Sequence, residues 1–190
     1  MEHFFKGIEG WFDDNDEKLY KYAVDYSKNN DIFVEIGSFK GRSASAMCVN
    51  IINSKKDITF YCVDTWNGSE EHQIGKNFED IDVVNGRLFD IFSHNTKIVS
   101  NYIRPIKTTS IEAVKLFKDK ELQFVYIDAS HDYINVSTDL NIWYPKVKSG
   151  GILAGHDWIY FEDVRRAVQE FAQEKRLTIT TMENSWMMKV

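Results

Sequence analysis

The sequence lacks the long apolar runs, the cysteine pairs and the excess of positive charge that are typical of several classes of protein. No apolar run approaches the roughly 18–20 residues that span a bilayer, and residues 1–6 carry charges where a signal peptide needs an apolar stretch. The two cysteines, Cys48 and Cys62, form no metal-type pair and fit small core residues in a reducing compartment. The net charge of −6 argues against binding of nucleic acid through its phosphates. We therefore expect a cytoplasmic protein without membrane or nucleic-acid partners.

Linker-like segments are also scarce, and there are only two prolines. The 190 residues are 43% hydrophobic and 27% charged, which suits one packed domain and is too apolar for disorder. Aromatic residues reach 14%, which indicates a core and a pocket rich in rings. We expect a single domain over residues 1–190. The acidic surface neither supports nor forbids a homo-oligomer.

Short apolar runs alternate with segments of helical periodicity. The runs typical of buried strands are 32–36, 59–63, 103–106, 124–127 and 152–154. The segments expected to be helical begin near Asp14, with Glu17 completing a capping box, and continue at 43–52, 111–117, 133–143 and 164–171. Residues 177–181 and 186–190 resemble a hairpin. This order predicts an α/β fold: a Rossmann-like, doubly wound, mainly parallel seven-stranded sheet with a C-terminal antiparallel hairpin.

Polar residues stand where the expected strands end. They are Glu35, Asp64, Asp128, His156 and Asp157. Ligands in doubly wound folds bind beyond the carboxyl ends of the strands. The sequence therefore predicts that these side chains share one site.

The first expected strand leads into a glycine turn before a helix. Gly37 would let the backbone approach a ligand, and Gly41 can adopt a dihedral that other residues avoid. The dinucleotide fingerprint needs a further glycine where this chain has Phe39, which disfavours NAD. Asp64 follows at about the spacing at which an acid meets ribose hydroxyls. Together these features favour a nucleoside-bearing ligand.

The turn Glu-Ile-Gly-Ser-Phe-Lys-Gly-Arg-Ser-Ala, residues 35–44, resembles motif I of class I S-adenosylmethionine-dependent methyltransferases. It is most similar to the variant in catechol-type O-methyltransferases, in which an aromatic residue also replaces the middle glycine. The stretches 63–69, 127–133 and 150–157 resemble a narrower branch, which includes macrocin- and mycinamicin-type sugar O-methyltransferases. The resemblance implies methyl transfer to a hydroxyl of a small or glycosylated metabolite.

The same resemblance implies a set of residues around S-adenosylmethionine. Asp64 would hold the ribose hydroxyls, the glycine turn would pass the methionine part, and Thr109 and Ser110 would border the adenine. The other residues expected beside the cofactor are Glu35, Gly37, Ser38, Gly41, Ser43, Thr65, Trp66 and Asp128. Ser43 is equally compatible with capping its own helix.

Acids and imidazoles at the strand ends point to a second function. In the resembling sugar methyltransferases, a metal is held by an Asp matching Asp128 and by an acidic pair matching positions 156 and 157, and the histidine matching His131 is the base. His156 replaces one acid here, which weakens a Mg²⁺ site and favours Mn²⁺, or leaves His156 outside the ligand set. The expected metal ligands are Asp128, His156 and Asp157. The expected catalytic residues are His131, as general base for a hydroxyl, and Asp128.

Residues 66–101 are polar and exceed the usual connection of about 2–6 residues. Because they follow a strand at its ligand-binding end, we expect a lid or substrate insertion. Trp66 is the first candidate there for contact with cofactor or acceptor. Two other functions stay open: a nucleotide-dependent oxidoreductase, which Phe39 disfavours, and a catalytically silent Rossmann-like binding module, which the intact acids and His131 disfavour.

Overall fold

The computed structural model of the chain describes residues 1–69 and 72–190. These residues form a seven-stranded sheet in the order β3-β2-β1-β4-β5-β7-β6. The strands are β1 Asp31–Ile36, β2 Ile58–Asp64, β3 Ile103–Lys107, β4 Leu122–Ile127, β5 Val147–Gly155, β6 Ile179–Met182 and β7 Ser185–Lys189. All neighbouring pairs are parallel except the two that involve β7. The predicted fold class and C-terminal hairpin are confirmed.

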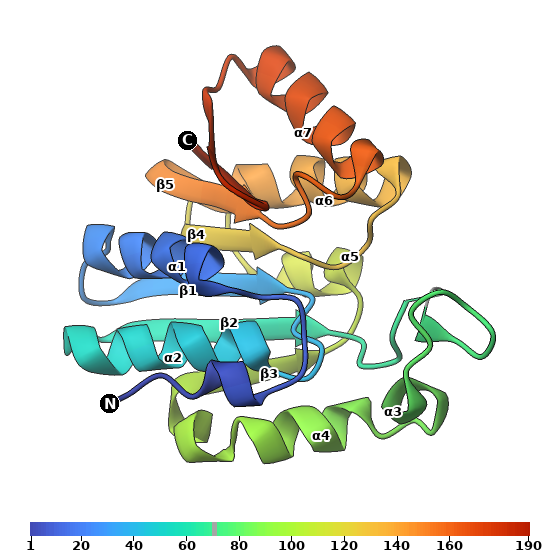
Figure 1. Ribbon diagram of the computed structural model, residues 1–190. Helices are drawn as coiled ribbons and strands as arrows, with labels where there is room; N and C mark the ends of the chain where they lie inside the picture. Colours follow the sequence, from blue (N-terminus) through green and yellow to red (C-terminus); the bar gives the residue numbers. More distant parts are fainter. Residues whose placement is uncertain (70–71) are drawn as a thin grey trace.

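Helices cover both faces of the sheet (Figure 1). They are α1 Asp14–Tyr26, α2 Arg42–Ser54, α3 Ile81–Val84, α4 Leu88–Asn95, α5 Ser110–Ala113, α6 Tyr133–Trp143 and α7 Glu162–Lys175. One core layer joins α1, α2 and α4 to side chains such as Phe33 and Phe124, and the other joins α5, α6 and α7 to side chains such as Val34 and Val125. Successive strand residues thus face opposite layers. None of the described helices is long and apolar enough to cross a membrane.

Two local predictions differ in detail from the structure. The capping box of α1 uses Asp13 and Asp16 rather than Asp14 and Glu17: Asp13 accepts from the Asp16 amide at 3.3 Å, and Asp16 accepts from the Asp13 amide at 2.8 Å. The helix expected over 111–117 is a short α-helix, α5, followed by a 3₁₀ turn at Val114–Leu116. Acidic residues stand at positions 13, 14, 16 and 17, around the start of α1. The sequence therefore left open, by one residue, which pair forms the capping box.

The turn after β1 packs directly against the turn after β4. The Asp128 amide donates to the Ile36 carbonyl at 2.8 Å. A Cβ atom on Gly37, whose φ is +88°, would lie 1.9 Å from the Asp128 carbonyl oxygen. Gly41 begins α2 at φ +87° against Thr96. Glycine is therefore required at both positions, and the close approach at Gly37 places the ends of β1 and β4 at one edge of the sheet.

Candidate active site

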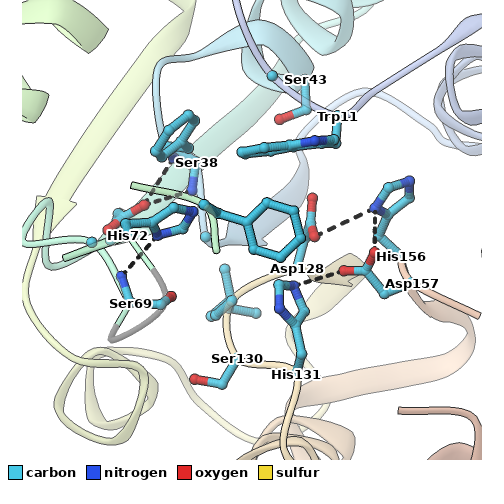
Figure 2. Close-up of a pocket in the computed structure, with 18 of the residues that line it drawn as sticks. Trp11, Ser38, Ser43, Ser69, His72, Asp128, Ser130, His131, His156 and Asp157 are labelled. Atoms are coloured by element: carbon cyan, nitrogen blue, oxygen red, sulfur yellow. Dashed lines mark hydrogen bonds and ion pairs between the residues drawn. The ribbon is translucent and has the colours of Figure 1, made fainter. Parts of the chain in front are cut away.

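A cavity of about 1480 Å³ opens beyond the carboxyl ends of β1, β2, β4 and β5 (Figure 2). Of the predicted strand-end residues, Asp64, Asp128, His156 and Asp157 line it. Pockets that enclose one drug-sized ligand typically have about 300–1,000 Å³. The cavity therefore has room for two ligands side by side.

Asp64 fastens the glycine turn to the end of β2. One carboxylate oxygen accepts from the amides of Ser38 at 2.8 Å and Phe39 at 2.9 Å. The other accepts from the Trp66 amide at 2.7 Å. Burial raises the pKa of Asp64, and the amide donors oppose that rise. The turn and the acid thus form one unit on the cavity wall, to which Gly37 and Ser38 also belong.

Glu35 lies beneath the turn, where it is fully buried and does not line the cavity. The Tyr20 hydroxyl donates to its carboxylate at 2.7 Å. Burial raises the pKa of Glu35 to about 7. The side chain interacts with Ser38 and Ser43, which line the cavity, so Glu35 supports the cavity wall from beneath and its contact with a cofactor stays a prediction.

The start of α2 decides between the two predictions for Ser43. Gly41 occupies the N-cap position, and no side chain caps the helix. Ser43 is the second residue of α2 and lines the cavity. The capping alternative is wrong, and contact of Ser43 with a ligand stays a prediction.

Trp66 belongs to the core rather than to the cavity. It is 2% exposed and packs against Phe89 and Phe92 with ring centroids at 4.7 and 4.8 Å. Its indole nitrogen donates to the Phe39 carbonyl at 3.0 Å. The neighbouring Thr65 does line the cavity. The prediction that the Trp66 ring contacts a ligand is wrong, because α4 of the inserted segment folds over that ring.

Thr109 and Ser110 lie at the start of α5 and line the cavity. Thr109 is the N-cap and accepts from the Glu112 amide at 3.3 Å. The Ser110 hydroxyl donates to Asp139 on α6 and accepts from the Trp143 indole at 2.7 Å. Burial raises the pKa of Asp139 to about 6. The Ser110 hydroxyl therefore holds α5 against α6, whereas the Thr109 hydroxyl caps α5.

His131 and Asp157 form an ion pair across the ends of β4 and β5. The Nε2 atom of His131 lies 2.9 Å from an Asp157 oxygen, and its ring stacks on Phe161 at a centroid distance of 4.0 Å. Burial raises the pKa of Asp157, but His131 and His156 outweigh burial and hold that pKa well below its ordinary value. Asp128, beside this pair, has its pKa raised to about 7 by burial.

His156 lies among carboxylates on both sides of its ring. Its Nδ1 atom is 3.3 Å from Asp157 and 3.7 Å from Asp128, and its Nε2 atom is 3.4 Å from Asp16. Burial lowers the pKa of His156, but the three carboxylates outweigh burial and raise that pKa to about 11. His156 is therefore an imidazolium inside the acidic cluster.

A family model described as a methyltransferase domain matches residues 34–158. This stretch holds the glycine turn, Asp64, Asp128 and the His131–Asp157 pair. The chain belongs to this methyltransferase family. The uncharacterized protein y4gI of Sinorhizobium fredii is 27% identical over 124 residues, which are 65% of this chain but 13% of that protein. The chain thus matches only a small part of that relative.

Solved structures show the same fold for this methyltransferase-family chain. The O-methyltransferase NovP superposes with a TM-score of 0.70 at 15% identity, covering 92% of this chain and 79% of NovP. An O-methyltransferase from Bacillus cereus, solved as a complex with SAH, superposes with a TM-score of 0.63 at 13% identity, covering 95% and 83% of the two chains.

The methyltransferase cavity brings together a different metal-ligand set from the one predicted. Asp128, His131 and Asp157 each offer one ligand atom, and these atoms all lie within 4.8 Å of one another. Two carboxylates and one imidazole suit a divalent cation such as Mn²⁺. His156 is not among these three residues, and its nitrogens face carboxylates on both sides; its role as a ligand stays a prediction. With His131 in the set instead, that imidazole would serve either as ligand or as base.

Two residues that contact His156 were missed by sequence reasoning. Asp16 reaches the site from α1 and accepts from the Ser185 hydroxyl at 2.7 Å. The side-chain amide nitrogen of Asn184, in the hairpin turn, lies 3.1 Å from the Nε2 atom of His156 and donates to Asp157 at 3.4 Å. Both come from segments distant in sequence from the family motifs. The acids at the start of α1 carried no signal beyond helix capping.

Proposed function

We propose that the chain transfers the methyl group of S-adenosylmethionine to a hydroxyl of a small-molecule acceptor. The observation that carries this proposal is the presence of the His131–Asp157 pair in the same cavity as the glycine turn and Asp64. A nucleoside site and an acid–base pair then share one space with room for two ligands. The SAH complex of the Bacillus cereus enzyme supports this choice of cofactor.

The cofactor would lie along the wall formed by the glycine turn, Asp64 and the start of α5. Asp64 would accept ribose hydroxyls, and Thr109 and Ser110 would border the base. When bound, S-adenosylmethionine supplies an electrophilic methyl group whose C–S electron pair stays with the sulfur. The many carboxylates of the cavity suit the positive charge of that sulfonium.

His131 would remove the acceptor's proton. Its Nε2 atom is paired with Asp157, and Phe161 holds the ring plane. The imidazole would take the hydroxyl proton of the acceptor. Asp157 would then stabilise the imidazolium. Holding the reacting atoms in line contributes the remaining acceleration, which can reach about 7–11 kcal/mol.

A metal-assisted reaction is the second candidate, favoured by the proximity of Asp128, His131 and Asp157. A divalent ion held by these three residues would lower the pKa of a bound hydroxyl. His131 would then be a ligand and could not accept the proton. With His131 as a ligand the two mechanisms exclude each other, whereas an ion held by Asp128 and Asp157 without it would leave the role of base to His131. A chelation experiment tests whether an ion is needed.

The acceptor implied by the sequence resemblance is a small or glycosylated metabolite, such as a sugar. The proposal covers acceptors that present a hydroxyl on a ring. The test is transfer of a labelled methyl group from S-adenosylmethionine to a panel of ring hydroxyl compounds, with His131→Ala in parallel. Labelling that depends on His131 supports the proposal. Binding of S-adenosylhomocysteine without labelling of any acceptor would favour the silent binding module.

A further inference from the structure

Four rings form a continuous aromatic wall on one side of the cavity. Trp11 contacts Phe39, His72 and Phe78 with ring centroids 5.7, 6.0 and 6.0 Å apart, and Phe39 stacks on His72 at 5.3 Å. All four residues line the cavity that also holds Asp128 and His131. Figure 2 shows Trp11 and His72 in the same pocket as those two residues.

The wall keeps a large apolar surface open. Trp11 is 58% exposed and Phe78 is 44% exposed, whereas Trp143 and Trp186 are fully buried. Open aromatic surface inside a cavity is typical of ligand-binding sites, since an isolated globular domain gains more by burying such rings. The indole of Trp11 is therefore placed to receive a ligand.

Lys40 fastens the two chain segments that carry the wall. Its ammonium group lies 2.8 Å from Glu9, 2.6 Å from Asp80 and 3.1 Å from Asp82, and its side chain is 3% exposed. Glu9 stands two residues before Trp11, and Asp80 stands two residues after Phe78. One buried cation thus ties both sides of the wall to the glycine turn.

Arg42, in addition to Lys40, holds the segment around Trp11 in place. Its guanidinium donates to the Ile8 carbonyl at 2.8 Å and to the Phe12 carbonyl at 2.7 Å. The acceptors lie on either side of Trp11 along the chain. The wall is therefore preorganised before a ligand arrives, which lowers the entropic cost of binding.

The charges around the cavity restrict what the wall can accept. Of the described lining residues, nine are Asp or Glu and three are Lys or Arg. Lys40 and Arg42 are two of those three, and both are engaged in holding the wall. Even with the protonated His156 counted, acidic groups outnumber basic ones in this lining, so an acceptor with a carboxylate or phosphate group would meet a net negative charge that repels it.

We propose that the aromatic wall is the acceptor subsite, and that it takes a hydroxylated aromatic ring without anionic groups. The inference rests on the proposed methyl transfer and deepens it. The ring would pack against Trp11 and Phe78 and present its hydroxyl to His131. Neutral and positively charged compounds fit; compounds with carboxylate or phosphate groups do not.

The test uses three probes that share a dihydroxyphenyl ring and differ only in an aminoethyl, hydroxyethyl or carboxyethyl side chain. Each is titrated by calorimetry into the full chain saturated with S-adenosylhomocysteine. We expect the amine and the alcohol to bind and the carboxylate to bind at least about tenfold more weakly. Equal or tighter binding of the carboxylate, or binding of none of the three, would overturn the proposal.

Substitutions at Trp11 locate the subsite. Trp11→Ala should weaken the amine and alcohol probes at least about tenfold, whereas Trp11→Phe should stay within about threefold, because it keeps a ring. The control is Tyr102→Ala, which removes a ring of 43% exposure outside the cavity lining. An unchanged affinity in Trp11→Ala would contradict the assignment. So would an equal loss of affinity for S-adenosylhomocysteine, which would place Trp11 in the cofactor site.

The first titration also separates the two proposals. If S-adenosylhomocysteine does not bind the wild type, methyl transfer itself is wrong. If it binds and the ring probes do not, only the acceptor assignment fails.

Discussion

The Nε2 atom of His131 lies 2.9 Å from a carboxylate oxygen of Asp157. The pair joins the loop after β4 to the end of β5, two strands that are neighbours in the sheet but lie about thirty residues apart along the chain. A histidine held by an acid at a cavity wall is the usual arrangement of a general base.

Removal of that imidazole should separate catalysis from cofactor binding. We expect His131→Ala to lower kcat about 10²–10⁴-fold, the typical contribution of a general base, and to leave the affinity for S-adenosylhomocysteine unchanged. His94→Ala is the matched control, because His94 is exposed and does not line the cavity. An unchanged kcat in His131→Ala would remove His131 from the reaction.

Chelation distinguishes the base from the metal. If His131 acts as the base without a metal, full activity should persist in excess EDTA, and added Mn²⁺ should inhibit by occupying Asp128, His131 and Asp157. Activity that is lost in EDTA and restored by Mg²⁺ or Mn²⁺ would instead establish the metal-assisted mechanism. Both results come from one initial-rate series.

Burial of Glu35 should make stability depend on pH. Its pKa is raised from 4.5 to about 7, so the folded state binds this proton more tightly than the unfolded state. The resulting stabilisation is full below about pH 4.5 and is lost as pH rises through 7, a change of about 3 kcal/mol. Glu35→Gln keeps an acceptor for Tyr20 and lacks the titration.

Urea unfolding of wild type and Glu35→Gln at pH 5 and pH 8 measures this effect. We expect the variant to gain stability relative to wild type at the higher pH. A difference between the two proteins that does not change with pH would show that the Glu35 carboxyl keeps its ordinary pKa in the fold.

The contact beneath Gly37 should make alanine there far more costly than at a comparable glycine. A Cβ atom at Gly37 would lie 1.9 Å from a backbone oxygen, whereas one at Gly86, whose φ is also positive at +67°, would meet nothing within 4 Å. Gly86→Ala should cost about 1–2 kcal/mol of backbone strain. Gly37→Ala should exceed about 4 kcal/mol. Equal unfolding free energies for the two variants would contradict the packing of the β1 and β4 turns.

Strand ends and the glycine turn could be predicted because each depends on a local pattern. A buried strand that stops at a polar residue marks the ligand-binding edge, which is how Asp64 and Asp128 were found. Predicted site residues that do not line the cavity are explained by packing. Trp66 follows a strand end as a ligand residue would, but its ring is covered by Phe89 and Phe92 from a helix more than twenty residues later.

The division of roles between two histidines also lay outside sequence reasoning. His156 matches a metal ligand by position, yet Asp128, Asp157 and Asp16 together raise its pKa and make it an internal cation. Of these three, Asp16 comes from α1 and could not be anticipated. The aromatic wall was missed for a similar reason. Trp11 and Phe78 belong to loops without periodicity, and tertiary contacts, among them those of Lys40, bring those loops together.

The most direct measurement is a calorimetric titration of the wild type and Asp64→Asn with S-adenosylhomocysteine, with NAD as the control and circular dichroism to verify the fold. We expect saturable one-site binding of S-adenosylhomocysteine to the wild type, at least about tenfold weaker binding to Asp64→Asn, and no binding of NAD. Binding of NAD alone would identify a nucleotide-dependent oxidoreductase. Binding of neither compound up to millimolar concentration would contradict methyl transfer by this chain.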